Sequence, residues 1–196
     1  DVVIVGSDQT WRPKYSPNIY NFYLDFLQSS KVRRVAYAAS FRVDEWEYSE
    51  QQTAVCAELL SKFDAISVRE LSGVSLCDQK LGVKAECVLD PTLLLTATDY
   101  GNALGLGESD GDAGGLFAYV LDDSPEIDAV ILKVSNELCL AAYKCQPRFS
   151  INRAGGKCVD DYAFPKVEEW VRSFRKADFV VTDSFHGCAM SIVFNK

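Results

Sequence analysis

The stretch F-V-V-T-D-S-F-H-G at residues 179–187 joins a short apolar run to a polar turn, and an apolar segment follows it at Cys188–Phe194. A strand that ends in a polar turn and leads into a helix is the repeating unit of folds with parallel sheets. The stretch V-V-I-V-G-S-D-Q-T-W at residues 2–11 also passes from an apolar run to a polar turn. Ligands of such folds bind at the carboxyl ends of the strands, so these turns are where functional residues are expected.

The rest of the chain continues this alternation of short apolar runs and amphipathic segments. Apolar residues recur at helical spacing in the segments after Glu50, near Pro125 and after Pro165, and this spacing predicts helices. Together the pattern predicts an α/β fold made of Rossmann-like units with mainly parallel sheets. The predicted strands are Val2–Val5, Val35–Ala39, Ala65–Val68, Glu86–Leu89, Leu116–Leu121, Ala141–Lys144 and Phe179–Thr182.

Two breaks in the pattern suggest a division into two lobes. Pro91 follows a predicted strand, and the segment Gly105–Gly115 contains five glycines with several acidic residues, a composition typical of a flexible loop. We therefore predict a partial N-terminal lobe at residues 1–92, a linker with a flexible glycine-rich loop at 93–115, and a partial C-terminal lobe at 116–196. Because the chain starts and stops on apolar elements, we expect an internal piece of a longer protein, truncated at one or both ends.

The composition limits the classes of function. The chain has 196 residues, of which 48% are hydrophobic, and 28 acidic against 20 basic residues give a net charge of −8. This balance argues against a dedicated nucleic-acid binder, and no apolar run approaches the ~18 residues of a transmembrane segment. The seven cysteines form no C-x-x-C pair and only one histidine accompanies them, so we predict no metal site. Scattered cysteines in apolar segments predict reduced, buried thiols and a cytoplasmic protein.

The first polar turn offers a hydroxyl, a carboxylate and an amide, on Ser7, Asp8 and Gln9. These groups could bind a ligand at the end of the preceding strand. They could equally form an ordinary tight turn, in which Gly6 supplies a positive φ and Asp8 caps the backbone. The local pattern leaves both interpretations open.

Arg69 follows the predicted strand Ala65–Val68. A buried arginine is costly unless it is paired, so its guanidinium either bridges to Glu70 or another acid or faces a cleft. In a cleft it could hold a carboxylate or a phosphate through two parallel hydrogen bonds. Residue 69 is thus a candidate for either role.

His186 is the only histidine of the chain and follows Asp183 and Ser184 at a strand–helix junction. An anionic substrate bound at this junction would let the imidazole exchange protons near neutral pH. The alternative is a histidine that caps or packs against the helix. Ser184 is not the nucleophile of a serine hydrolase, because the G-x-S-x-G motif is missing.

The chain resembles the polysaccharide pyruvyl transferase family over nearly its whole length. The motifs that carry this resemblance are the stretch at 2–11, Y-L-D-F at 23–26, V-A-Y-A-A-S-F at 35–41, F-D-A-I-S-V-R-E at 63–70, S-G-V at 72–74, V-L-D-P-T-L-L-L at 88–95 and A-D-F-V-V-T-D-S-F-H-G at 177–187. Ketal-forming members often read R-L-H-G where this chain has S-F-H-G at 184–187. The resemblance implies two lobes of the GT-B type.

It also implies an activity: transfer of the pyruvyl group of phosphoenolpyruvate onto hydroxyls of a sugar or lipid-linked glycan, for a bacterial cell-surface polysaccharide or exopolysaccharide. Phosphoenolpyruvate is then the donor substrate, and no further cofactor is needed. The resemblance implies that His186 acts as acid and base and that Arg69 clamps the anionic donor. Asp183 and Ser184 would orient groups or form hydrogen bonds, and Gly187 would leave room for the ligand. Ser7, Asp8 and Gln9 would line the opposite side of the cleft. The alternatives are a GT-B-like glycosyltransferase that uses a nucleotide sugar and a non-catalytic sugar-binding homologue.

Overall fold

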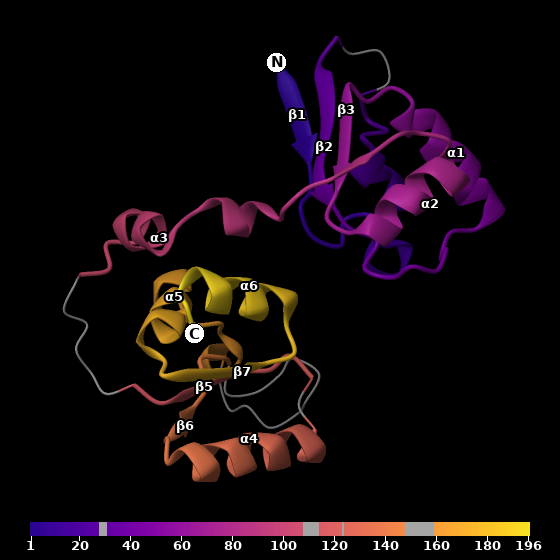
Figure 1. Cartoon of the computed structure of the whole chain (residues 1–196). Helices are drawn as coiled ribbons and strands as arrows, with labels where there is room; N and C mark the ends of the chain where they lie inside the picture. The colour runs from indigo at the N-terminus through magenta and orange to yellow at the C-terminus, as the bar shows by residue number, and fades with distance from the viewer. Residues whose placement is uncertain (28–30, 108–113, 123, 148–158) are drawn as a thin grey trace. The chain divides into compact units, whose positions relative to one another are not determined.

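The structure is a computed structural model that describes residues 1–27, 31–107, 114–122, 124–147 and 159–196. The chain divides into two compact units, Asp1–Leu94 and Leu95–Lys196 (Figure 1). Each unit contains its own sheet, of four strands in the first and three in the second. Each is therefore described by itself.

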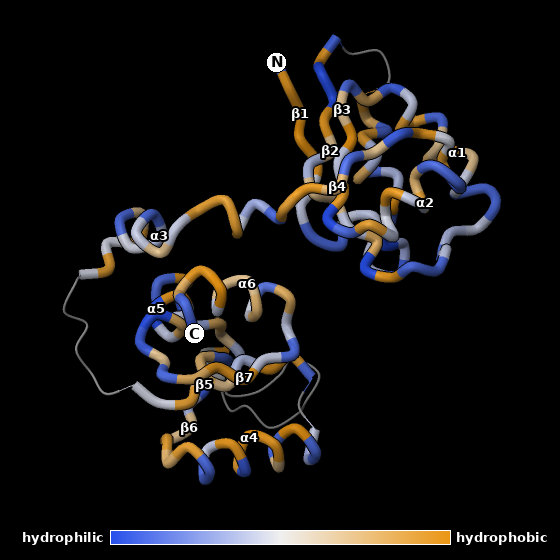
Figure 2. Tube along the Cα trace, viewed as in Figure 1, coloured by the Kyte–Doolittle hydropathy of each residue, from blue (hydrophilic) through white to orange (hydrophobic). Residues whose placement is uncertain are grey.

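In the first unit the strands lie in the order β1-β2-β3-β4, and every neighbouring pair is parallel. The apolar run that forms β1 is visible in Figure 2. Helices α1 and α2 pack against each other beside this sheet (Figure 1). The elements are β1 (Val2–Val5), β2 (Arg33–Ala39), α1 (Glu50–Leu60), β3 (Ala65–Val68), α2 (Leu71–Leu81) and β4 (Glu86–Cys87), with 3-10 helices η1 (Pro13–Tyr15), η2 (Ile19–Tyr23) and η3 (Pro91–Leu94).

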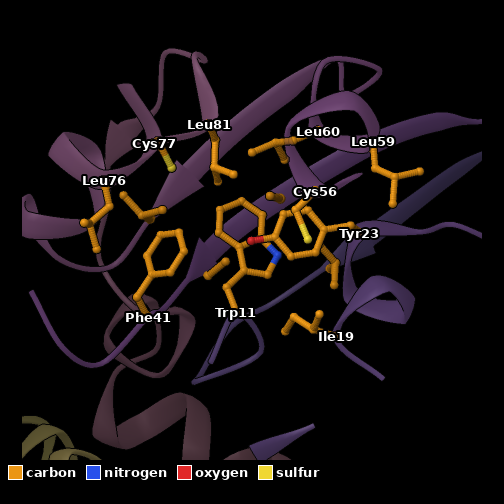
Figure 3. Packing of buried hydrophobic residues seen from close by; sticks show 14 of the residues in the cluster. Trp11, Ile19, Tyr23, Phe41, Cys56, Leu59, Leu60, Leu76, Cys77 and Leu81 are labelled. Atoms are coloured by element: carbon orange, nitrogen blue, oxygen red, sulfur yellow. The ribbon is translucent and has the colours of Figure 1, made fainter. Parts of the chain in front are cut away.

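An aromatic cluster in the core of this unit fixes the polar turn after β1 (Figure 3). Trp11, at the end of the turn, is fully buried and stacks on Tyr23 with ring centroids 5.1 Å apart. The Tyr48 hydroxyl donates to the Trp11 carbonyl at 2.6 Å and lies 2.8 Å from the Tyr23 hydroxyl. Burial raises the pKa of both tyrosines. The turn at residues 6–10 is thus held between β1 and this core.

In the second unit the sheet has the order β6-β5-β7, again with parallel pairs. Helix α4 lies on one side of the sheet and α5 and α6 on the other (Figure 1), and each side has its own cluster of buried residues. The elements are α3 (Ala97–Ala103), β5 (Leu116–Tyr119), α4 (Pro125–Leu138), β6 (Ala142–Tyr143), η4 (Val159–Tyr162), α5 (Val167–Lys176), β7 (Phe179–Thr182) and α6 (Phe185–Val193).

The predicted α/β class with parallel sheets is confirmed. The bounds of β1, β3 and β7 agree with the predicted ranges, while β4, at Glu86–Cys87, is shorter than the predicted Glu86–Leu89. The GT-B-like relation of the two lobes stays a prediction.

The predicted linker at 93–115 is more structured than expected. It contains helix α3, and Leu106 is buried against Phe117 and Phe174 in the core of the second unit. On the other side of the loop the Gly115 carbonyl accepts a hydrogen bond from Asp178 N at 3.0 Å. Residues 105–107 and 114–115 are therefore part of the folded unit, whereas residues 108–113 of the predicted loop lie outside the described residues.

The predicted burial of the cysteines is correct for two of them. Cys56 and Cys77 are buried, and burial raises the pKa of each thiol to about 12. Cys87, Cys139 and Cys188 are exposed and Cys145 is half-buried, while Cys158 lies outside the described residues. Among the described residues, no helix is both long and apolar enough to span a bilayer.

Candidate functional site

In the first unit the loops that follow β1 and β2 are tied to each other. The Asp8 carbonyl accepts hydrogen bonds from Thr10 N at 2.7 Å and from Ser40 N at 2.9 Å. Gly6 has a φ of +109°, and a Cβ there would lie 2.2 Å from the Tyr37 carbonyl oxygen. Asp8 has a φ of 62° and Arg42 one of 67°, a backbone conformation that residues other than glycine rarely adopt. Such residues cluster at functional sites, which makes this edge of the sheet the candidate site of the unit.

Arg69 lies at this edge and binds carboxylates from two other loops. Its Nη1 donates to Asp90 Oδ2 at 3.1 Å, and its Nη2 to Asp8 Oδ1 at 3.3 Å. The Arg69 side chain is 9% exposed, that of Asp90 0% and that of Asp8 57%. Asp90 is held in turn, since its Oδ1 accepts from Thr92 N at 3.0 Å and from Thr92 Oγ1 at 2.8 Å. The guanidinium therefore has one buried and one exposed acidic partner.

Glu70, the nearest acid in sequence, is a weaker partner of Arg69, because its Oε2 lies 4.0 Å from the guanidinium Nε. Its Oε1 instead accepts from Ser40 Oγ at 3.1 Å and from Phe41 N at 2.8 Å. Glu70 thus fixes the loop after β2. Asp90, which the sequence analysis did not single out, holds Arg69, and its position after the predicted strand Glu86–Leu89 was the available signal.

Gln9 lies beside Asp8 in the same turn, and its Oε1 is buried without a hydrogen-bond partner among the described residues. A buried acceptor without a donor costs about 1–3 kcal/mol. A ligand donor at this position would remove that cost. Ser7 is half-buried in the same turn, so the structure brings the predicted residues 7–9 together with Arg69.

In the second unit β7 ends at Thr182, and His186 is the second residue of α6. The imidazole meets the Phe185 ring edge to face, with centroids 5.3 Å apart and planes at 87°. His186 is half-buried. The imidazole therefore lies at the carboxyl end of β7, at the start of helix α6.

Both carboxylate oxygens of Asp183 accept hydrogen bonds from backbone amides. Oδ1 accepts from Leu121 N at 2.8 Å, and Oδ2 from Asp122 N at 3.0 Å. These amides belong to the loop after β5. Asp183 thus ties the ends of β5 and β7 together.

Ser184 is the N-cap of α6, and its hydroxyl accepts from Gly187 N at 3.4 Å. A Cβ on Gly187 would lie 2.1 Å from Thr182 Oγ1. The room that we expected Gly187 to leave for a ligand is therefore filled by Thr182, and the glycine lets α6 pack closely on the end of β7. Within the described residues, no three His, Cys, Asp or Glu side chains gather as a metal site.

A comparison with known protein families identifies the family of this chain. The family model for polysaccharide pyruvyl transferase matches residues 1–196, the whole chain. No curated protein and no solved structure matches the chain. Because the family match covers the whole chain, the chain belongs to the polysaccharide pyruvyl transferase family.

Proposed function

We propose that the protein transfers the pyruvyl group of phosphoenolpyruvate to two hydroxyls of a sugar and forms a pyruvate ketal. The acceptor is a cell-surface polysaccharide or its lipid-linked precursor. Membership of the family supports transfer to a polysaccharide. The donor and the ketal product are what the resemblance to ketal-forming members of the family implies, and the types of residue at the strand ends of each unit are compatible with that chemistry.

The proposed reaction begins with protonation of the methylene carbon of phosphoenolpyruvate. The neighbouring carbon becomes oxocarbenium-like, and a sugar hydroxyl adds to it and gives up its proton. A second hydroxyl then replaces phosphate on the same carbon, which closes the ketal and releases inorganic phosphate. The donor methylene ends as a methyl group, and the second hydroxyl proton leaves with phosphate or solvent. The reaction thus needs one acid, one base and a clamp for the anionic donor.

His186 is proposed as the acid and base. The observation that carries this role is its position, as the only histidine of the chain, at the end of β7 and the start of α6. The amino end of a helix attracts an anion, so the donor and the imidazole would meet there. Asp183 and Ser184 bind backbone amides, and we assign them to positioning the junction and not to proton transfer.

Arg69 is proposed as the clamp for a donor carboxylate or phosphate. Asp90 is fully buried and holds Nη1, whereas Asp8 is exposed and holds Nη2. Within the first unit, an oxyanion could therefore replace Asp8 at Nη2 while Asp90 keeps the guanidinium in place. Ser7 and the buried Gln9 Oε1 would then contact hydroxyls of the bound substrates.

The test is mass spectrometry of candidate glycans after incubation with the full chain and phosphoenolpyruvate. The proposal predicts a product that gains one ketal-linked pyruvyl group, together with one phosphate released per product. In a parallel reaction with a nucleotide sugar in place of phosphoenolpyruvate, no glycan should gain mass. Gain of a sugar unit in that reaction would identify a glycosyltransferase, and binding of glycan without either product would identify a sugar-binding homologue.

A further inference from the structure

The second unit contains a pocket of about 290 Å³ between α3, the end of α5 and the residue that follows α6. Its walls include the side chains of Leu106 and Phe194, and its polar groups are on Asn102, Thr98 and Arg175. This size is just below the usual range of about 300–1,000 Å³ for small-molecule sites. The pocket therefore suits a ligand about as large as a monosaccharide.

Arg175 is the charged residue that lines this pocket. Its Nη1 donates to the Leu106 carbonyl at 3.2 Å, which fixes the guanidinium. Within the described part of the chain it forms no ion pair, and it differs from Arg34 and Arg42, which also form none there, in that it lines an open pocket. A half-buried guanidinium without a carboxylate favours an anion from outside the chain.

Gly101 is the second observation that points to a ligand. It lies inside helix α3, where glycine is about 1 kcal/mol less favourable than alanine. Its φ is not in the left-handed region, and the nearest atom to a Cβ built there would be Arg175 Nη1 at 3.9 Å. Neither backbone conformation nor packing within the described chain therefore requires a glycine. Its lack of a side chain leaves the pocket open next to Arg175.

The pocket is separate from the His186 junction. His186 lies at the start of α6, and Phe194 comes directly after its end. A helix rises about 1.5 Å per residue, so these two residues lie roughly 12 Å apart along the helix. A ligand in the pocket would therefore not touch the imidazole.

We propose that this pocket binds a small organic oxyanion, with a sugar-sized body and one phosphate or carboxylate group. The oxyanion accepts hydrogen bonds from Arg175. The body lies over Gly101 and against the Phe194 ring, and its hydroxyls reach the Asn102 amide and the Thr98 hydroxyl. This site is independent of the proposed transfer reaction.

The test is isothermal titration calorimetry of the full chain with glucose 1-phosphate, glucose and inorganic phosphate as probes. Glucose 1-phosphate should bind more tightly than glucose, because the oxyanion contact is lost in the neutral sugar. Arg175→Gln should weaken its binding roughly 10- to 100-fold, as expected when a charged hydrogen-bond donor is removed. If inorganic phosphate binds as tightly as glucose 1-phosphate, the pocket does not recognise a sugar-sized body, and the proposal is overturned in favour of a simple anion site.

Gly101→Leu keeps the test decisive even if Arg175→Gln unfolds the unit. Leucine is a better helix former than glycine, so this variant should keep or raise the unfolding temperature while its side chain fills the pocket and abolishes binding. Lys176→Gln is the matched control, since it removes one positive charge from the same helix end without lining the pocket; its affinity should stay within about twofold of the parent. Binding that survives Gly101→Leu, or no binding of any probe at millimolar concentration, would overturn the proposal.

Discussion

In the unit Asp1–Leu94 the edge of the sheet is held by charge, because Arg69 bridges the loop of Asp8 to the buried Asp90. In the unit Leu95–Lys196 the corresponding edge is held by backbone amides, which donate to Asp183 and Ser184. At the first edge the proposed ligand-binding residue, Arg69, also holds the loops together, whereas at the second edge the loops are held without the imidazole of His186. Removing a charge should cost stability at the first edge, whereas removing the imidazole should cost turnover at the second.

The largest effect is expected for His186. His186→Ala and His186→Asn should each lower turnover by about 10² to 10⁴, the usual contribution of a positioned acid and base. Both variants should unfold within a few degrees of the parent, because Asp183 and Ser184 hold the junction without the imidazole. Steady-state release of phosphate and thermal unfolding measure the two quantities. Full activity in a folded His186→Asn protein would reduce this histidine to a structural role.

At the first edge the two acidic partners of Arg69 should differ in their effect on stability. Asp90→Ala leaves a guanidinium that is 9% exposed without its buried partner, which should lower the free energy of unfolding by about 3–5 kcal/mol. Asp8→Asn removes an acid that is 57% exposed and keeps a residue that tolerates the φ of 62°, so it should cost about 1 kcal/mol or less. Urea denaturation of both variants gives the comparison. Equal losses would mean that the network is not anchored through Asp90.

Arg69→Lys tests the proposed clamp more directly than a change of its acidic partners. A lysine keeps the charge but loses the planar fork, so donor binding should weaken by about 1–3 kcal/mol. Titration of phosphoenolpyruvate against the folded variant measures the change. Unaltered donor affinity would assign Arg69 to the structural network alone.

Close packing at the second edge should appear as a moderate loss of stability in Gly187→Ala. The added Cβ would meet Thr182 Oγ1 at 2.1 Å, so α6 would have to shift, at a cost of about 1–3 kcal/mol. Gly107→Ala is the control, because no atom lies within 4 Å of a Cβ built there. Its unfolding free energy should change by about 0.5 kcal/mol or less. A neutral Gly187→Ala would show that the edge can relax.

The smallest effect is expected at Glu47, whose carboxylate pairs with Arg12 and Lys14 in the first unit. Hydrogen bonds from Arg12 and Lys14 lower the pKa of Glu47 to about 2, from 4.5. Since the folded pKa is lowered, the stabilisation is present above pH 4.5 and is lost as the pH falls toward 2. The unfolding free energy of the parent should exceed that of Glu47→Gln by about 1 kcal/mol at pH 6, and the difference should shrink over this window. A difference that is constant with pH would contradict the ionic origin.

Most strands could be predicted because each is a short apolar run between polar turns. Helix α2 was missed, although Val74, Cys77 and Leu81 have helical spacing, because Ser72-Gly73 has the composition of a turn. Helix α3 was missed because it has seven residues and contains Gly101. In both cases burial against the rest of the unit outweighs a weak local preference for helix.

Most residues of the candidate site could be predicted, but the groups to which they bind could not. The ends of the strands pointed to Asp8, Arg69 and His186, because parallel sheets place such residues at one edge. The partner of Arg69 could not be chosen from neighbouring residues, since Asp90 is 21 positions away and the adjacent Glu70 binds the loop after β2. Likewise, the amides that bind Asp183 are 61 and 62 positions away. These contacts depend on tertiary packing.

The central claim, protonation of the donor methylene by a site that depends on His186, is tested most directly by the reaction in D₂O. The parent and His186→Asn chains are each incubated with phosphoenolpyruvate and glycan, and the products are compared by mass spectrometry. The account predicts that the parent yields a pyruvyl ketal with one deuterium in its methyl group, and that the folded variant yields at least about 10²-fold less product. A ketal without deuterium, or equal yields from both proteins, would contradict the account.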